Sequence, residues 1–265
     1  MKKAYLLYER EDSKKNNVFI EQMIETARKK GIELILVIAD EIDLNMMNEA
    51  LFVWNRTRNP KITKKLEEDG IKVFNRSFVN ELANDKKETL KFAQLHGIPT
   101  VPILSEDQIQ QYPIIIKTID GHGGNEVALC NSMEDLKFYQ SKWHERQLLI
   151  QPYIETNSTD VRIWVVGSNI IGAVKRKGSH DFRSNYTLGG SIEKYNLSDE
   201  QRLQVLTLQQ ALKSDYIGID FLLLPDGKWL LNEVEDPVGA RSFYNLYDKD
   251  LPTILMDYFV REIES

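Results

Sequence analysis

The chain has 265 residues, of which 42% are hydrophobic and 28% charged, an ordinary composition for a soluble globular protein. Its formal net charge of −6 argues against nucleic acid as the main partner. No apolar run approaches the ~20 residues of a membrane helix, and the single cysteine excludes an internal disulfide. We therefore expect a cytoplasmic protein with neither a membrane nor a nucleic-acid partner.

The first 84 residues alternate between strand and helix patterns. AYLLYE, which begins at Ala4, and ELILVIAD, which begins at Glu33, are typical of strands, and apolar residues recur at helical spacing between them. Asn59 and Pro60 favour a helix start, Gly70 favours its end, and IKVF then predicts another strand. This alternation predicts a small open α/β lobe over residues 1–84.

The remaining two-thirds of the chain mixes hairpins with helices. Asp85, Ser132 and Ser198 each have the character of a helix cap, and PIIIKTI and LLIQPYI are typical of buried strands. Two longer segments predict hairpins, one turning at 167–169 and one at 226–227. These patterns predict an α+β body that differs from the first lobe.

Three carboxylates gather in the second predicted hairpin. A two-residue turn at 226–227 would place Asp220 opposite Glu233, with Glu235 on the same face. Like charges that face one another destabilise a sheet. A bound cation would remove the conflict, and Mg²⁺ usually joins protein carboxylates to substrate phosphates, so a nucleotide is implied. The alternative is that the hairpin ends in solvent and the acids are only hydrated, and a one-residue bulge would change the register.

Lys117 lies inside the apolar segment IIIKT, where its ammonium group needs an anion. Gly121, Gly123 and Gly124 follow, and glycines allow the backbone to approach a phosphate closely. The order of lysine and glycines is not that of a Walker loop. The alternative is a lysine that reaches solvent before an ordinary loop, and Lys86 at a predicted helix start has the same alternative.

The segment VKRKGSHDFRSN contains the densest group of basic residues: Lys175, Arg176, Lys177 and Arg183. It predicts either an anion pocket or a solvated loop. On the preceding predicted strand, Asp160 and Arg162 share one face, which could combine a ribose acceptor with a phosphate donor.

Taken in chain order, these motifs resemble the ATP-grasp carboxylate–amine ligases, most closely the RimK-type branch, over nearly the whole chain. NDKKETLKFAQLHGIPTVP is similar to the family's D-K-x-x-T helix and G-I-P, and IIIKTIDGHGG to its strand lysine and phosphate loop. QPYI occupies the adenine hinge, and DVRIWVVG with AVKRK carries the Asp-x-Arg and a later arginine. DFRSNYTLGG is close to D-F-R-S-N…G-G, and GIDFLL with NEVE supplies the metal acids.

The sequence departs from the family pattern at three places. Glu235 replaces the asparagine of the usual E-V-N, and Pro152 replaces the usual hinge glutamate. The segment after the metal strand is longer and reads DPVGARSFY, in which Arg241 could offset the acids or contact a substrate carboxylate.

The resemblance implies an ATP-grasp fold, with a small N-terminal open α/β lobe followed by two α+β lobes that enclose ATP. The ATP-grasp domain would span 85–265, with a central lobe over about 100–152 and a C-terminal lobe over about 153–265. The implied ATP-binding residues are Lys86, Lys117, Gly121, Gly123, Gly124, Gln151, Tyr153, Ile154 and Asp160. Among them the lysines and glycines would hold phosphates, the hinge residues adenine, and Asp160 ribose.

The same resemblance implies that Asp220, Glu233 and Glu235 hold one or two Mg²⁺ ions, with Mn²⁺ as an alternative. The implied catalytic residues are Arg162, Arg176, Arg183 and Asn185. These would steady the transferring phosphoryl group and the tetrahedral intermediate, and the glycine loop would close as a lid.

The implied function is an ATP-dependent, ADP-forming ligase, which joins a carboxylate to an amine through an acyl phosphate. Its partners would be ATP, an amino-acid amine, and a carboxylate on a small acid, a peptide or a carrier protein. Two alternatives are a dipeptide or glutathione-like ligase that uses free small acids, and a non-catalytic ATP-binding module. The sequence leaves the substrates and homo-oligomer formation open.

Overall fold

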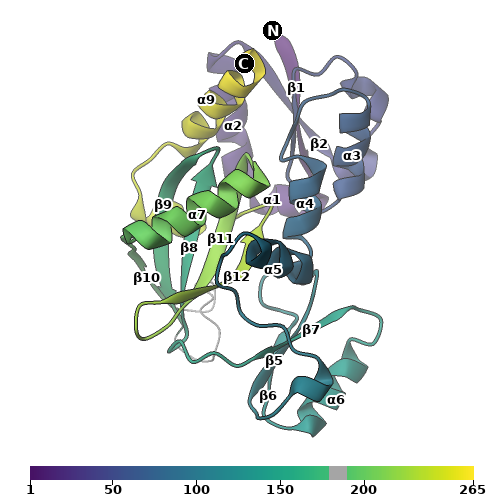
Figure 1. The fold of residues 1–265 in the computed structure, drawn as a ribbon. Helices are drawn as coiled ribbons and strands as arrows, with labels where there is room; N and C mark the ends of the chain where they lie inside the picture. The colour runs from purple at the N-terminus through teal and green to yellow at the C-terminus, as the bar shows by residue number, and fades with distance from the viewer. Residues whose placement is uncertain (179–189) are drawn as a thin grey trace.

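Three separate sheets make up the molecule, as the computed structural model shows for residues 1–178 and 190–265 (Figure 1). The N-terminal sheet is fully parallel, with strand order β2-β1-β3-β4. Its strands are β1 (Lys2–Tyr8), β2 (Ile32–Ile38), β3 (Val53–Asn55) and β4 (Val73–Phe74). Its helices are α1 (Arg10–Lys15), α2 (Asn17–Lys29), α3 (Pro60–Glu68) and α4 (Ser77–Ala83). The predicted alternation of strands and helices is therefore confirmed, although IKVF forms only a two-residue strand.

The predicted start of α3 is also confirmed. The Asn59 side chain accepts a hydrogen bond from the Lys61 amide at 3.1 Å, and Pro60 occupies the first helical position. A proline fits there because the first amide groups of a helix have no partner within the helix.

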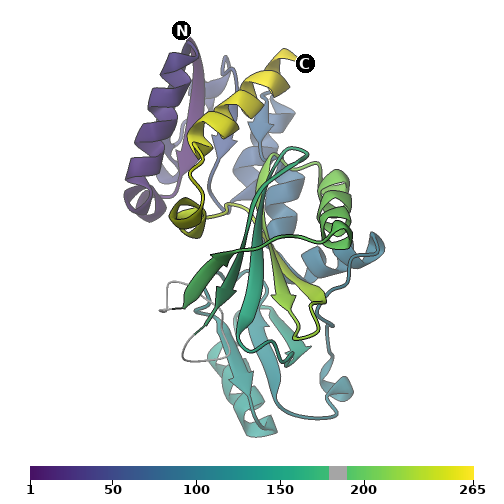
Figure 2. The same ribbon diagram turned by 90° about the vertical axis from the view of Figure 1, so that its left-hand side faces the viewer.

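The last helix, α9 (Leu251–Glu264), packs on the N-terminal sheet even though it follows the C-terminal lobe in sequence (Figure 2). Its Phe259 stacks on Phe74 with ring centroids 4.4 Å apart and also contacts Phe52 and Trp54. These rings are all fully buried, and aromatic burial of this kind is a major contribution to core stability. The two ends of the chain are thus joined in one core, and the predicted domain boundaries stay a prediction.

A three-stranded sheet in the order β6-β5-β7 forms the central lobe. Its elements are β5 (Ile114–Thr118), β6 (Val127–Cys130), α6 (Met133–Lys142) and β7 (Leu148–Pro152). Helix α5 (Lys86–Leu95) precedes it, and the Asp85 side chain caps that helix by accepting from the Lys87 and Glu88 amides. The connection between β5 and β6 is the predicted glycine-rich loop.

The C-terminal sheet is antiparallel, in the order β10-β9-β8-β11-β12. Its strands are β8 (Thr159–Val166), β9 (Asn169–Lys177), β10 (Ser191–Lys194), β11 (Tyr216–Leu223) and β12 (Trp229–Glu235). Its helices are α7 (Asp199–Leu212) and α8 (Arg241–Leu246), and Ser198 caps α7 with the predicted capping box. No helix in the described ranges has the length and apolar character needed to span a membrane.

Both hairpins of this sheet contain a one-residue bulge. Val166 pairs with Asn169 at the first turn, yet Asp160 pairs with Arg176, one residue further than the turn alone would give. In the second hairpin the loop has three residues, 225–227, because the Leu224 amide donates to the Lys228 carbonyl at 2.8 Å. The predicted two-residue turn is therefore wrong.

The bulge at Asn232 corrects the effect of that longer loop. Phe221 pairs with Leu231 and Asp220 with Glu233, so Asn232 is the extra residue of β12. Without it a three-residue loop would put Asp220 opposite Asn232 and turn Glu233 to the other face. The predicted pairing of Asp220 with Glu233 is therefore confirmed, but it depends on the bulge at Asn232 and not on a two-residue turn.

Candidate nucleotide and metal site

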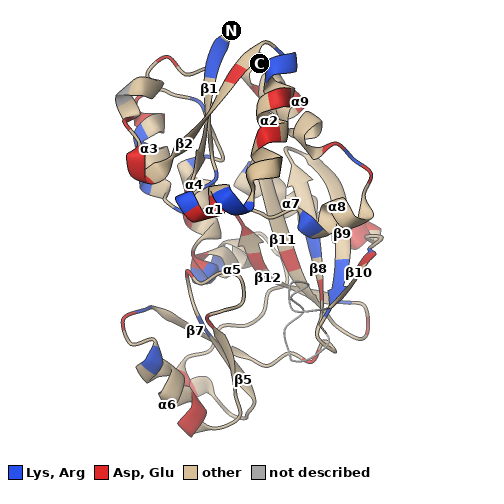
Figure 3. Cartoon of the chain, turned by 180° about the vertical axis from the view of Figure 1, so that it is seen from behind, with Lys and Arg blue, Asp and Glu red and all other residues tan. Residues whose placement is uncertain are grey.

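Four neighbouring strands of the C-terminal sheet carry charged residues (Figure 3), and five of these residues share one face. Asp220 on β11 pairs with Arg162 on β8 and with Glu233 on β12. The neighbouring row places Asp160 opposite Arg176, and Asp160 lies two residues from Arg162 on the same strand. Since residues two apart share a face of a strand, all five side chains project to one side.

Two arginines neutralise the acids of this face. Arg162 donates to Asp220 through Nε at 2.8 Å and Nη2 at 2.6 Å, and its Nη2 also contacts Glu235. Arg176 donates to Asp160 through Nε at 2.7 Å and Nη2 at 2.6 Å, and from Nη2 to Asp220 at 2.7 Å. Paired, two-point contacts of this kind are the strongest that a carboxylate makes with a side chain.

Burial argues against simple hydration for Asp220, whereas Glu233 and Glu235 are only partly buried. Asp220 is 2% exposed and Asp160 6%, and their partner Arg176 is 5% exposed. Burial alone would raise the pKa of Asp220, but Arg162 and Arg176 outweigh it and hold the pKa at about 2. Asp220 is therefore a carboxylate at any physiological pH.

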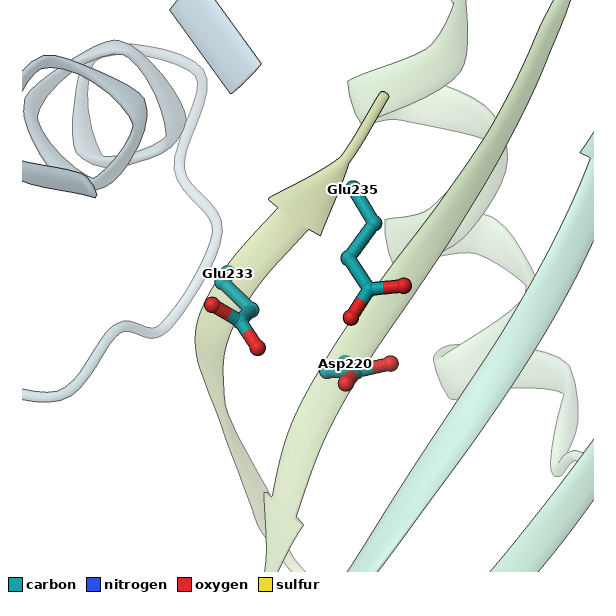
Figure 4. A group of neighbouring side chains, drawn as sticks. All are labelled: Asp220, Glu233 and Glu235. Carbon is teal, nitrogen blue, oxygen red and sulfur yellow. The ribbon is translucent and has the colours of Figure 1, made fainter. Parts of the chain in front are cut away.

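Asp220, Glu233 and Glu235 also present carboxylate oxygens that lie within 4.8 Å of one another (Figure 4). This donor set consists of oxygen atoms alone, which suits a hard cation such as Mg²⁺. Burial, with the negative charges of Asp220 and Glu233 nearby, raises the pKa of Glu235 to about 7 even though Arg162 opposes the shift. The three carboxylates thus form a donor set that fits a divalent cation.

Two lysines face this cluster, one from the central lobe and one from the helix that precedes it. Lys117 on β5 is 6% exposed and donates to the Asn232 side chain on β12 at 3.0 Å, so it bridges the two sheets. Lys86, at the first position of α5, contacts the Gly121 carbonyl and lies 3.7 Å from Glu233. Burial lowers the pKa of Lys117 to about 8, although Glu233 opposes the shift.

The glycine-rich loop adopts a backbone that glycine alone accommodates well. Gly123 and Gly124 have φ angles of 68° and 75°, in the region that side chains disfavour. A Cβ atom on Gly121 would lie 2.3 Å from Thr118 Oγ1 and 2.8 Å from Glu126 Oε2. Arg146 holds the base of the loop, donating to Glu126 at 2.9 Å and to Asp120 at 2.6 Å.

The predicted nucleotide residues line a cavity of about 170 Å³ between the central and C-terminal sheets. They are Lys86, Lys117, Gly121, Gly123, Gly124, Gln151, Tyr153, Ile154 and Asp160. Arg176 and the three acids of the cluster line it as well. The structure therefore brings together the nine residues that the sequence assigned to ATP, and their individual roles stay a prediction.

A second cavity, of about 360 Å³, lies between this site and the N-terminal lobe. The two cavities share Lys86, Arg176, Glu233 and Glu235, together with Gly121, His122 and Gly123 of the glycine loop, whereas Arg162 lines only the second cavity. The predicted catalytic residues Arg183 and Asn185 lie outside the described residues.

Sequence reasoning missed three residues that shape the site. Asn232 holds Lys117, Arg146 anchors the glycine loop, and Arg56 of the N-terminal lobe lines the second cavity. Asn232 is adjacent to Glu233 in the sequence, but the bulge determines to which face of the sheet its side chain points. Neither arginine belongs to a motif, so the sequence contained no signal for them.

Known proteins resemble this chain over most of its length. It is 27% identical over 252 residues to the protein MG011 of Mycoplasma genitalium, and the match covers 92% of this chain and 88% of that protein. It is also 27% identical over 214 residues to beta-citrylglutamate synthase B of Mus musculus, covering 74% of this chain but only 55% of the longer synthase.

Among solved structures, the D-alanine–D-alanine ligase of Bacillus anthracis in complex with ATP superposes with a TM-score of 0.78. The superposition covers 100% of this chain and 98% of the ligase, at 17% sequence identity. A likeness at that identity concerns the fold, and it confirms the predicted ATP-grasp fold.

The family model described as the RimK-like ATP-grasp domain matches residues 82–259, which is more than half of the chain. The match includes the nine nucleotide residues and the metal acids described above. The chain belongs to the RimK-like ATP-grasp family.

Proposed function

We propose that this protein is an ATP-dependent, ADP-forming ligase that joins a carboxylate to the amine of an amino acid. The observation that carries the proposal is the wall shared by the two cavities, which contains Lys86, Arg176, Glu233 and Glu235. A nucleotide in the smaller cavity and a carboxylate in the larger one would meet at this wall. Family membership and the names of the two ligating relatives support amide-bond formation.

In the proposed reaction a carboxylate oxygen attacks the γ-phosphorus of ATP, the bond to the bridging oxygen breaks, and ADP leaves. The amine then attacks the acyl carbon, inorganic phosphate leaves, and the amide forms. Neither step needs a side-chain nucleophile, so the protein contributes position and charge. Buried cations with fixed geometry are the groups that this chemistry requires.

The charged residues fit these roles. Lys117 and Lys86 are placed to hold phosphate oxygens, the first because it is buried and the second because it also contacts the glycine loop. Arg176 is fixed by two carboxylates and borders both cavities, so it is placed to stabilise the transferring phosphoryl group. Asp160 holds Arg176 and lies in the nucleotide cavity, where it would also meet the ribose.

Asp220, Glu233 and Glu235 would hold one or two Mg²⁺ ions, or Mn²⁺ in their place. When bound, such an ion neutralises phosphate oxygens and helps to align the reacting groups. The glycine loop and its Arg146 anchor would shield the cleft from water, which protects a reactive acyl phosphate.

The second cavity has about the volume of a small-ligand pocket and so admits a small acid or the end of a peptide. The test is ADP release across a matrix of carboxylates and amino acids with Mg-ATP, with products identified by mass. We expect at least one pair to give stoichiometric ADP and amide, and Lys117→Met to abolish both. Lys137→Met, on an exposed position of α6, is the matched control.

Nucleotide binding without ADP release for any pair would contradict the ligase and favour a non-catalytic ATP-binding module. Product formation only with free small acids would instead favour the dipeptide or glutathione-like alternative.

A further inference from the structure

The wall shared by the two cavities contains a histidine. His122 lies in the glycine-rich loop between Gly121 and Gly123, and it lines both cavities. Lys86 contacts the Gly121 carbonyl and lies 3.7 Å from Glu233, so the loop is tied to the metal acids at the position directly before His122. His122 therefore lies where the contents of the two cavities would meet.

The amide-forming step of the proposed reaction needs a proton acceptor. At neutral pH an amino acid arrives mainly as its ammonium form, whose nitrogen has no lone pair with which to attack the acyl carbon. That nitrogen must lose one proton before the attack and a second as the amide forms. The departing phosphate can take only one of the two. A positioned side chain that takes a proton in such a step typically contributes about 10²–10⁴-fold to the rate.

His122 is the residue of the shared wall that is equipped to accept this proton. Lys86 and Arg176 are cations, and Glu233 and Glu235 belong to the donor set that fits a metal ion. A neutral imidazole has one nitrogen with a free lone pair. Within the described parts of the chain, His122 forms no hydrogen bond or ion pair that would occupy that nitrogen.

The acids of the second cavity that lie away from the metal cluster are already engaged. Each accepts a hydrogen bond or forms an ion pair within the protein. They are Asp12 with Lys15 and Arg58, Asp120 with Arg146, and Asp236 with Asn80. These contacts stabilise the carboxylates and make them poorer proton acceptors than an unpaired imidazole.

The charges around His122 keep its ring neutral. Partial burial lowers the pKa of His122, and the positive charges of Arg58 and Lys86 add to this shift, whereas Asp12 and Glu126 oppose it. An ordinary histidine has a pKa of about 6.5, so a lowered value leaves the ring mostly unprotonated at pH 7. A base in this form is ready to take a proton.

We propose that His122 is the general base of amide formation. The inference rests on the proposed function, because it needs an amine and an acyl phosphate at the shared wall. His122 takes one proton from the ammonium group, and the freed amine attacks the acyl carbon. The carbon–nitrogen bond forms, the bond from that carbon to the phosphate oxygen breaks, and the second proton leaves with phosphate. His122 is exposed, so it can then return its proton to water.

A comparison of two nucleophiles tests this role, with the carboxylate and the amino acid that give ADP and amide in the substrate matrix. Hydroxylamine replaces the amino acid in the second arm, since it is largely uncharged at neutral pH and needs no base. His122→Gln keeps a polar side chain that cannot act as the base. We expect it to lower kcat for amide formation by about 10²-fold, and to leave hydroxamate formation and the KM for ATP near those of wild type.

His144→Gln is the matched control, because the His144 side chain is 73% exposed and lines neither cavity. It should keep both rates. The pH dependence of kcat is a second readout: wild-type amide formation should fall as pH is lowered through the pKa of His122, and His122→Gln should lose that inflection.

The inference is overturned if His122→Gln forms amide at the wild-type rate. It is also overturned if the variant slows amide and hydroxamate formation equally, which a purely structural role in the loop would produce. If wild type forms amide but captures no hydroxylamine, an unchanged inflection in the variant overturns it. A wild type that releases no ADP with any substrate pair would instead contradict the proposed function itself, and the inference with it.

Discussion

Two buried aspartates, one within β11 and one just before it, lie in opposite electrostatic surroundings. On the cleft side Asp220 accepts hydrogen bonds from Arg162 and Arg176, and its pKa is about 2. Directly before the first residue of the strand, Asp215 is 7% exposed and accepts a hydrogen bond from the Tyr258 hydroxyl at 2.7 Å. Burial raises the pKa of Asp215 to about 7 although the Tyr258 hydroxyl and Lys72 oppose the shift, and no arginine of the described residues forms an ion pair with it.

This contrast shows what the arginines of the cleft contribute. Burial penalises both carboxylates, and only a paired guanidinium makes the charged form the stable one. The cleft side therefore carries fixed charge in a water-poor site, which is the condition for strong electrostatic stabilisation of a reaction. Asp215 instead holds its proton up to about pH 7 and lies away from the cleft. Each prediction below changes one side of this comparison.

The largest effect is expected from Asp220→Asn. The variant leaves Arg162 and Arg176 buried without the carboxylate that they share, and breaking a buried ion pair from one side costs about 3–5 kcal/mol. We expect the free energy of unfolding in the absence of nucleotide to fall by about 3 kcal/mol, measured by chemical denaturation. The sequence alone had favoured the opposite sign, because it showed the acids facing one another and not their arginines.

Glu193→Gln is the control for that variant, since Glu193 pairs with Lys175 at 2.9 Å on the exposed surface. Such surface pairs contribute at most about 1 kcal/mol. If both variants changed stability equally, the arginines would not be what stabilises the charge of Asp220.

Arg176→Ala should reduce kcat by about 10²–10³-fold, the cost of removing one donor from a developing charge. The KM for ATP should change less, since the contact strengthens in the transition state. Lys175→Ala, on the opposite face of the same strand, should leave kcat near that of wild type. An unchanged kcat in Arg176→Ala would restrict the arginine to holding Asp160 and Asp220.

Glu233→Gln should weaken the stabilisation that Mg-ATP gives. At a ligand concentration of 100 times Kd, a ligand that binds only the folded state adds about 2.7 kcal/mol. We expect that gain for wild type and less than half of it for the variant, from thermal unfolding with and without Mg-ATP. Equal gains would show that the cluster is not the metal site.

The sequence predicted most of this fold, and its limits have a physical cause. Helix starts such as Asn59-Pro60 depend on neighbouring residues, so they are visible in sequence. Strand register beyond a turn depends on bulges, and neither bulge has a residue pattern of its own. The first bulge places Asp160 opposite Arg176 in place of Lys175, and the second restores Asp220 opposite Glu233. Motif order thus predicted the residues of the site, whereas their pairing required the structure.

The sequence also did not predict that the N-terminal lobe contributes Arg56 to the second cavity. Arg56 reaches the cleft because β3, which directly precedes it, ends there, and because its guanidinium donates to the Val238 carbonyl. Contacts between residues so far apart in sequence follow from tertiary packing and leave no local pattern.

The smallest effect is expected at the outer end of β11, from Asp215→Asn. An aspartate in the unfolded chain ionises near pH 4, whereas Asp215 in the folded protein ionises near pH 7. Between these values the folded state holds a proton that the unfolded state has lost, so wild-type stability falls as pH rises through this window. Asn cannot ionise and loses no stability there.

We expect wild type and variant to be equally stable near pH 4, and the variant to be about 2 kcal/mol more stable near pH 7.5. The expected difference is smaller than the full pKa shift would give at ~1.4 kcal/mol per pKa unit, because the surroundings of an ionised carboxylate relax. Denaturant unfolding at several pH values measures it, with Asp248→Asn at an exposed position as the control. A stability difference that does not vary with pH would show that Asp215 is already ionised in the folded protein, and the contrast with Asp220 would then have to come from something other than the arginines.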